Sequence, residues 1–312
     1  MDDADWPELR YGELKDTCET LQLWTQVVGK VRLALTPWLN HSWHVPLYVT
    51  AHGLGTGPIP CGARPLDIEF DFVGQALRLR RADGGAQALP LRAGSVAGFY
   101  ADVREALAAL GAAVAIHPVP NELPDPVPFP EDHAQRRYDP EQALRFWLAT
   151  AQAWRVFSAF RTGFLGKSSP VHFFWGSFDL AVTRFSGRPA PPHPGGAPHL
   201  PDAVAREAYS HEVSSAGFWP GGGGIDYPAF YSYAYPEPGG FRAAAAAPAA
   251  AFYHEGLGEF ILPYEAVRTA ADPDAALLAF LRSTYAAAAD LGGWDRAALE
   301  CEIGRPGIVR PV

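Results

Sequence analysis

The side chains that could do chemistry gather in three segments rich in histidine, carboxylate and aromatic residues. The densest segment, residues 168–184, holds His172, Asp179 and Arg184 among bulky apolar residues. A buried imidazole, carboxylate or guanidinium needs a hydrogen-bond partner or an opposite charge. The segment therefore has two interpretations: a core histidine and aspartate satisfied by backbone groups, or polar groups that line a pocket. In a pocket, His172 and Asp179 would be catalytic and Arg184 would hold an anionic substrate group.

The second segment, residues 209–220, places His211 directly before Glu212. Adjacent residues of a regular helix or strand point in different directions, so this pair could act together only from a loop. His211 is therefore either a metal ligand or general base with Glu212 as its carboxylate partner, or a side chain that fixes a loop by a hydrogen bond.

The third segment is Asn40-His41-Ser42-Trp43-His44, in which His44 is expected to begin a strand. If the chain contains an internal duplication, His44 and His172 occupy equivalent positions and approach each other between the halves. Together with His211 or a carboxylate they would form a metal site with open coordination positions. This hypothesis predicts a divalent metal ion, either iron, zinc or manganese.

Strong catalytic signatures are absent from the sequence: it has no H-E-x-x-H, G-x-S-x-G or C-x-x-C motif. Gly166-Lys167-Ser168 resembles the end of a nucleotide-binding loop, but Arg161 replaces the first glycine that such a loop requires. The glycines at 221–224 lead into Ile-Asp-Tyr-Pro rather than a helix, which argues against a dinucleotide fingerprint.

Four helices are predicted to position these segments. The first spans about residues 12–28 and stops at Gly29, and the second begins at Ser95. The third and fourth open with Asp-Pro pairs at Asp139 and Asp272, since aspartate caps a helix and proline fits its first turn.

Strand patterns lie between these helices, at residues 44–50, 66–72, 178–185 and 230–235. Strict alternation in residues 66–72 leaves three carboxylates on one face, which most simply is solvated. In the last strand Tyr231 and Tyr233 share a face with Tyr235.

The order of these elements repeats along the chain. Each half reads helix, Gly-Lys, a histidine that begins a strand, further strands and a helix. The sequence thus predicts an α+β fold of two pseudo-repeated helix–strands–helix halves, joined into one mainly antiparallel sheet sandwich or open barrel flanked by helices. The halves are residues 1–117 and 139–312, packed as one unit, with a proline-rich linker at 118–138. The alternative is a chance recurrence of common elements.

Composition and charge narrow the class of protein. Of the 312 residues, 48% are hydrophobic and 19% charged, which suits a folded chain with a large core. A net charge of −9 argues against nucleic acid as a partner. No apolar run is long enough for a membrane span, and the three cysteines lie far apart, so a cytoplasmic protein is expected.

Four stretches of the sequence are distinctive: SPVHFFWGSFDLAVTRFSGRPAP, HEVSSAGFWPG, PAFYSYAYPEP and HVPLYVT. With the chain from Trp24 to about Trp294, they resemble a family of bacterial proteins classed as a domain of unknown function. The resemblance implies a stand-alone bacterial protein. It supplies no activity and no catalytic residues.

The sequence predicts a small-molecule enzyme with a His/carboxylate pocket between the halves. A metal ion there would support either redox chemistry or hydrolysis, and both are open. The predicted catalytic residues are His172, Asp179, Arg184, His211 and Glu212. The predicted pocket walls are Trp175, Phe218, Trp219, Tyr231 and Tyr233, and the predicted metal ligands are His44, His172 and His211. One alternative is a non-catalytic protein that binds a small molecule or sugar in an aromatic-lined pocket. Another is an interaction protein that docks through exposed aromatic loops.

Overall fold

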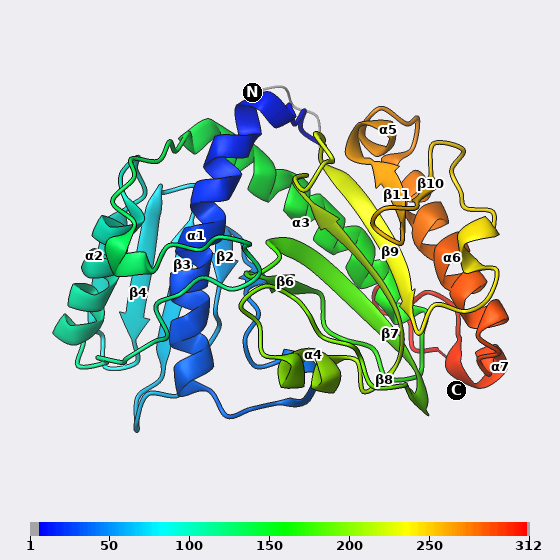
Figure 1. The fold of residues 1–312 in the computed structure, drawn as a ribbon, viewed down its shortest axis with the longest axis horizontal. Helices are drawn as coiled ribbons and strands as arrows, with labels where there is room; N and C mark the ends of the chain where they lie inside the picture. The colour runs from blue at the N-terminus through cyan, green and yellow to red at the C-terminus, as the bar shows by residue number, and fades with distance from the viewer. Residues whose placement is uncertain (1–5, 311–312) are drawn as a thin grey trace.

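The computed structural model describes residues 6–310, which form two antiparallel sheets and the helices around them (Figure 1). The smaller sheet has its strands in chain order: β1 (Tyr48–Val49), β2 (Gly53–Gly55), β3 (Leu66–Asp71), β4 (Ala76–Arg81) and β5 (Ala86–Pro90). The larger sheet has the spatial order β10-β11-β9-β8-β7-β6. Its strands are β6 (His172–Phe174), β7 (Asp179–Pro189), β8 (His211–Trp219), β9 (Ala229–Tyr235), β10 (Phe252–His254) and β11 (Glu259–Pro263).

The described part of the chain also contains α-helices and short 3-10 turns. The helices are α1 (Tyr11–Leu35), α2 (Val96–Ala109), α3 (Pro140–Thr162), α4 (Asp202–Ala208), α5 (Tyr264–Arg268), α6 (Pro273–Leu291) and α7 (Arg296–Leu299). The 3-10 turns are η1 (Asn40–Ser42), η2 (Phe129–Glu131) and η3 (Phe241–Ala243).

Helices α3 and α6 cover one face of the larger sheet, and α1 lies between the two sheets, against α2 and α3 (Figure 1). The helix-covered face carries aromatic side chains: the ring of Phe146 lies 6.0 Å from that of Phe218, and the ring of Phe157 lies 6.3 Å from that of Phe230. Because strand side chains alternate, this core leaves the neighbouring strand residues to the opposite face. That opposite face is available to form a site.

The two sheets meet at one isolated bridge between Leu47 and Phe173. Each residue donates its backbone N–H to the carbonyl of the other at 2.9 Å. The α+β class and the antiparallel strands are confirmed, and each half runs helix, sheet, helix in chain order. The sheets do not close into a barrel. An ancestral duplication stays a prediction.

The predicted helix starts at Ser95, Asp139 and Asp272 are confirmed, since each side chain accepts a hydrogen bond from a backbone N–H of the first turn. The predicted end of the first helix is wrong, because α1 continues through Gly29 to Leu35. Residues 209–220, treated as a loop segment, contain the long strand β8.

The carboxylates of β3 are less solvated than expected. Asp71 and Glu69 are each only 6% exposed. Arg78 pairs with Asp71 at 2.6 Å, and Arg80 pairs with Asp67 at 3.1 Å and also with Glu69. The face is thus a network of ion pairs in which two of the three carboxylates are covered by arginine.

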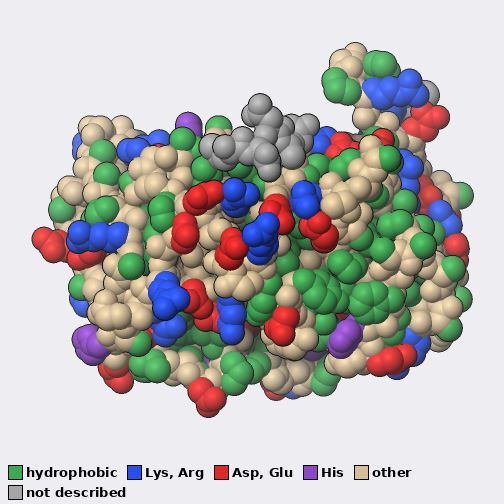
Figure 2. Space-filling model, turned by 90° about the horizontal axis from the view of Figure 1, so that it is seen from above, with side chains coloured by type: hydrophobic (Ala, Val, Ile, Leu, Met, Phe, Trp, Pro, Cys, Tyr) green, Lys and Arg blue, Asp and Glu red, His purple; other side chains and the backbone are tan. Residues whose placement is uncertain are grey.

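The surface mixes charges of both signs. Figure 2 shows acidic and basic side chains interspersed across one face, where the basic ones form no continuous patch. None of the helices in residues 6–310 combines the length and the apolar character that crossing a membrane requires.

Candidate functional site

A cavity of about 1040 Å³ lies over the face of the larger sheet that is turned away from α3 and α6. Strands β6 to β9 and the start of β11 contribute its floor. Its walls come from α1, from residues 38–45 and 117–122, and from residues 193–209, which include α4. Both predicted halves therefore contribute to one cavity, whose size suits a small organic molecule.

Strand alternation decides which side chains reach this cavity. Ala181 of β7 pairs with Gly217 of β8, which in turn pairs with Tyr231 of β9. A Cβ atom at Gly217 would lie 2.3 Å from Cζ of the Tyr231 ring. The glycine therefore leaves room for the Tyr231 ring to lie over β8 and reach Asp179.

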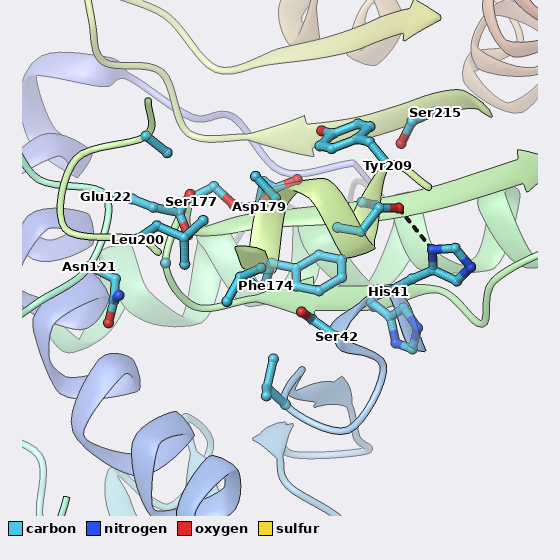
Figure 3. Close-up of a pocket in the computed structure, with 18 of the residues that line it drawn as sticks. His41, Ser42, Asn121, Glu122, Phe174, Ser177, Asp179, Leu200, Tyr209 and Ser215 are labelled. Carbon is cyan, nitrogen blue, oxygen red and sulfur yellow. Dashed lines mark hydrogen bonds between the residues drawn. The ribbon is translucent and has the colours of Figure 1, made fainter. Parts of the chain in front are cut away.

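Asp179, the first residue of β7, is the polar centre of the cavity. It is only 5% exposed, and it accepts hydrogen bonds from the hydroxyls of Ser177 and Tyr231 on its two oxygens. Figure 3 shows Asp179 beside Ser177 and Glu122, with Tyr209, which follows α4, and Ser215 of β8 farther away. Two hydroxyl donors satisfy a buried carboxylate without neutralising its charge.

Two glutamates complete a cluster of three carboxyl groups around this centre. Glu122 has a φ of 62°, and its backbone N–H donates to the carbonyl of Pro198 at 2.8 Å. A Cβ atom at Gly176 would lie 2.0 Å from Oε1 of Glu122, so this glycine makes room for the carboxyl group. Glu259 enters from the first position of β11, on the same cavity.

Burial makes these carboxyl groups hard to ionise together. Burial raises the pKa of Glu122 to about 7, and the charge of Asp179 adds to the effect. The same two causes raise the pKa of Glu259 to about 7. Burial also raises the pKa of Asp179, but the Ser177 and Tyr231 hydroxyls oppose that shift by stabilising the ionised form. Near neutral pH we therefore assign the charge to Asp179 and exchangeable protons to the two glutamates.

This arrangement predicts a pH-dependent effect of Glu259→Gln on stability. The folded-state pKa of Glu259, about 7, lies above its ordinary value of 4.5, so folding favours the protonated form. The free energy of unfolding therefore falls as pH rises from about 4.5 to 7, because the folded protein favours protonated Glu259. Above pH 7 this destabilisation keeps its full value. Glu259→Gln should raise the free energy of unfolding by about 1–3 kcal/mol at pH 8 and change it little at pH 4.5.

Urea unfolding of both proteins at pH 4.5, 6 and 8 measures this difference. The control is Glu105→Gln, at an exposed position of α2. A gain for Glu259→Gln that is equal at all three pH values would contradict the assignment.

Lys30 and His41 add polar groups to the cavity at separate places, since Figure 3 shows Asn121, the partner of Lys30, well away from His41. Lys30 is 3% exposed, its ammonium donates to Oδ1 of Asn121, and burial lowers its pKa to about 8. His41, labelled in Figure 3, has its Nδ1 2.8 Å from the carbonyl of Ala208. Its Nε2 lies 2.6 Å from Nζ of Lys167. Burial, chiefly, lowers the pKa of His41, so its ring is neutral, with Nδ1 donating and Nε2 accepting.

His172 stands in the cavity without a hydrogen-bond partner. It is 1% exposed and lines the cavity from β6, but neither of its ring nitrogens is hydrogen-bonded in the structure. Burial lowers its pKa to about 3, and the charges of Arg32 and Arg161 add to the shift. A neutral imidazole with both nitrogens free can donate one hydrogen bond to a ligand and accept another.

The structure brings together several of the predicted pocket residues and leaves others outside. Those that line the cavity are His172, Trp175, Asp179, Trp219, Tyr231 and Tyr233. Those that do not line it are His44, Arg184, His211, Glu212 and Phe218.

Strand alternation corrects the placement of Arg184 and Phe218. The Phe218 ring packs 6.0 Å from Phe146 and 5.1 Å from Phe230, on the helix-covered face. Arg184 donates to the carbonyl of Phe160 at 2.6 Å, and its guanidinium carbon lies 3.6 Å from the centre of the Phe160 ring. Arg184 is therefore held on the helix side and cannot bind an anionic group in the cavity.

His211 and Glu212 begin a strand, so their side chains diverge instead of acting together from a loop. Glu212 pairs with Arg188 at 2.7 Å, and Arg188 also donates to the carbonyls at the C-terminal end of α6. The His211 ring lies 5.9 Å from that of His41. The alternation of β8 thus sends the side chains of His211 and Glu212 to opposite faces of the sheet.

Within residues 6–310, no group of three or more His, Cys, Asp or Glu side chains is arranged to hold a metal ion. His44, His172 and His211 accordingly do not form such a group. His44 instead lies 3.3 Å from the carbonyl of Leu39 through Nδ1, with its ring 4.6 Å from that of Trp38.

Four residues of the cavity were not predicted as site residues from the sequence: Glu122, Glu259, Tyr209 and Lys30. Glu122 lies in the segment predicted to be a proline-rich linker, where no site residue was expected. Glu259 is the first residue of β11, between Gly258 and an apolar run.

The comparison with protein families covers nearly the whole chain. A family model matches residues 6–301. The chain belongs to a family of unknown function, DUF5996. The predicted membership in a family of unknown function is thereby confirmed, and the match includes every cavity residue described above. The bacterial source and the stand-alone organisation stay predictions. No curated protein and no solved structure matches the chain. Membership in DUF5996 thus defines a family but leaves the chemistry to the cavity itself.

Proposed function

We propose that this protein is an enzyme that acts on a small organic molecule by proton transfer in the cavity. The observation that carries the proposal is the cluster of Asp179, Glu122 and Glu259 in a partly apolar cavity of about 1040 Å³. Two of these carboxyl groups have a pKa of about 7, where a group can both give and take a proton. Carboxyl groups whose environments separate their pKa values are typical of acid–base sites.

The roles follow from the contacts of each group. Asp179 is the base, because the hydroxyls of Ser177 and Tyr231 stabilise its ionised form and orient it. Glu122 or Glu259 is the acid, because each holds a proton near neutral pH. In one step Asp179 accepts a proton from the substrate and a glutamate delivers one to a second substrate atom, so charge and protons balance. Removal of the product then lets a proton pass from Asp179 back to the glutamate through solvent.

The test is turnover in a mixture of small metabolites, followed by mass spectrometry. We expect at least one compound to disappear, and its product to appear, with the wild-type protein but not with Asp179→Asn. Asp67→Asn, in the smaller sheet and outside the cavity, is the matched control and should behave as wild type. The proposal fails if the wild-type protein converts nothing, or if Asp179→Asn converts the same compound equally fast.

A non-catalytic binding protein is the second candidate, and the aromatic walls favour it. Trp43, Phe174 and Trp219 offer apolar faces to a ligand without reactive groups of their own. The same experiment separates the two candidates: a binding protein retains a compound through gel filtration and releases it unchanged.

A divalent metal ion and a cytoplasmic location stay predictions. Iron, zinc or manganese would polarise a substrate or activate water, and elemental analysis of protein purified without a tag or chelator is the direct check. The cytoplasm is supported by Cys18, Cys61 and Cys301, which are free thiols in the structure.

A further inference from the structure

We infer that the cavity takes an organic ammonium compound with an apolar body and one further hydrogen-bonding group. The inference deepens the proposed function, on which it rests for the identity of the site. It concerns which class of molecule enters, and it opposes the anionic substrate that the sequence suggested through Arg184.

The first step is the charge of the carboxyl cluster. Asp179, Glu122 and Glu259 share one cavity, yet among residues 6–310 no basic side chain contributes to the pKa of any of them. Lys30, the buried ammonium of the same cavity, donates to Asn121 instead. Asp179, the charged member near neutral pH, therefore lacks the cation that a buried charge ordinarily has. The two glutamates would also need a cation nearby in order to ionise fully. A ligand cation would meet both needs.

The second step concerns the aromatic side chains around the carboxyl groups. Tyr231, Tyr233 and Trp219 line the cavity next to the carboxyl groups, and the Tyr231 and Tyr233 rings stack with centres 6.1 Å apart. Aromatic faces attract an organic cation, and they exclude the water that a small metal ion would retain. Phe174 and Phe185 extend the apolar lining along the floor, which suits the body of the ligand.

The third step is independent of the carboxyl groups. His172 lines the same cavity from β6, is 1% exposed, and has both ring nitrogens unpartnered. A buried polar group of this kind ordinarily has a partner, and the His172 side chain lies at the wall of a cavity that a ligand can fill. Because the ring is neutral, it suits a hydroxyl or amide of the ligand rather than a second charge.

The test compares three probes of one shape: 2-phenylethylammonium, the neutral 2-phenylethanol and the anionic 3-phenylpropionate. Isothermal titration calorimetry at pH 7 should give tighter binding of the ammonium probe, by about tenfold over the alcohol and more over the carboxylate. Binding of the cation should also release protons, because it lowers the pKa of Glu122 and Glu259. The release appears as a dependence of the binding enthalpy on the ionisation heat of the buffer.

Variants locate the binding. Glu259→Gln should weaken the ammonium probe about tenfold and leave the alcohol unchanged, whereas Asp67→Asn should change neither. His172→Phe should leave these three probes alone and weaken an ammonium probe that carries an added amide. If Glu259→Gln is poorly folded, Tyr231→Phe is the second variant, with the same expected selectivity.

Equal or tighter binding of the alcohol or the carboxylate would overturn the inference, as would an ammonium affinity that survives Glu259→Gln and Tyr231→Phe. The binding assay needs no turnover, so it fails separately from the proposed function. Ammonium binding without conversion of any compound would support this inference and contradict the proposed enzymatic function. Conversion of a neutral or anionic compound would do the reverse.

Discussion

Gly29→Ala should destabilise the protein by about 2–4 kcal/mol, although the same change inside a helix ordinarily stabilises it. Gly29 lies within α1, and a Cβ atom there would stand 2.2 Å from Nε1 of Trp175. The indole is 7% exposed and donates to the carbonyl of Val45 at 2.9 Å, so it cannot move aside without losing that hydrogen bond. The clash outweighs the gain in helix propensity, which is about 1 kcal/mol.

The control for this prediction lies in the same helix. Gly12 is exposed near the start of α1, and a Cβ atom there has no heavy atom within 4 Å. Gly12→Ala should therefore be neutral or stabilise the protein by up to about 1 kcal/mol. Thermal and urea unfolding of the two variants measure the contrast. A Gly29→Ala protein as stable as wild type would show that Trp175 is not fixed against α1.

Gly29 also shows what sequence can and cannot predict about this fold. Helix starts are local: the side chains of Ser95, Asp139 and Asp272 cap the backbone a few residues away, and all three were predicted. A glycine can end a helix or make room for a neighbour, and only the partner distinguishes these uses. Trp175 is distant in sequence, so the predicted helix end at Gly29 was wrong.

The same distinction between local pattern and distant partner separates the site residues that were predicted from those that were not. The sequence of one strand predicts which side chains alternate, and it correctly predicted that Tyr231 and Tyr233 share a face. The side of a sheet that a helix will cover is not readable from one strand, so Arg184 and Asp179 of β7 were treated alike although they face opposite sides. Glu122 reaches Asp179 only because a distant segment folds over Gly176. Convergence of this kind depends on tertiary packing.

The proposed chemistry makes its largest prediction at Asp179. Asp179→Asn should lower kcat for the compound found in the turnover experiment by about 10²–10⁴-fold, because the amide cannot accept a proton at neutral pH. The variant should remain folded, since asparagine has the same shape and its oxygen can still accept from Tyr231 or Ser177. Circular dichroism and thermal unfolding establish that control, and Tyr231→Phe should cost less because the base itself remains.

The pH profile tests whether Asp179 is ionised beside the two glutamates, as the acid–base assignment requires. In the wild type, kcat should fall above about pH 7 as the acid, Glu122 or Glu259, loses its proton. The charge of Asp179 contributes to the raised pKa of both glutamates. Removing that charge should therefore move the alkaline limb of the residual activity to lower pH. If the alkaline limb does not move, Asp179 does not carry the charge that raises the pKa of the glutamates, and that outcome would refute the acid–base assignment.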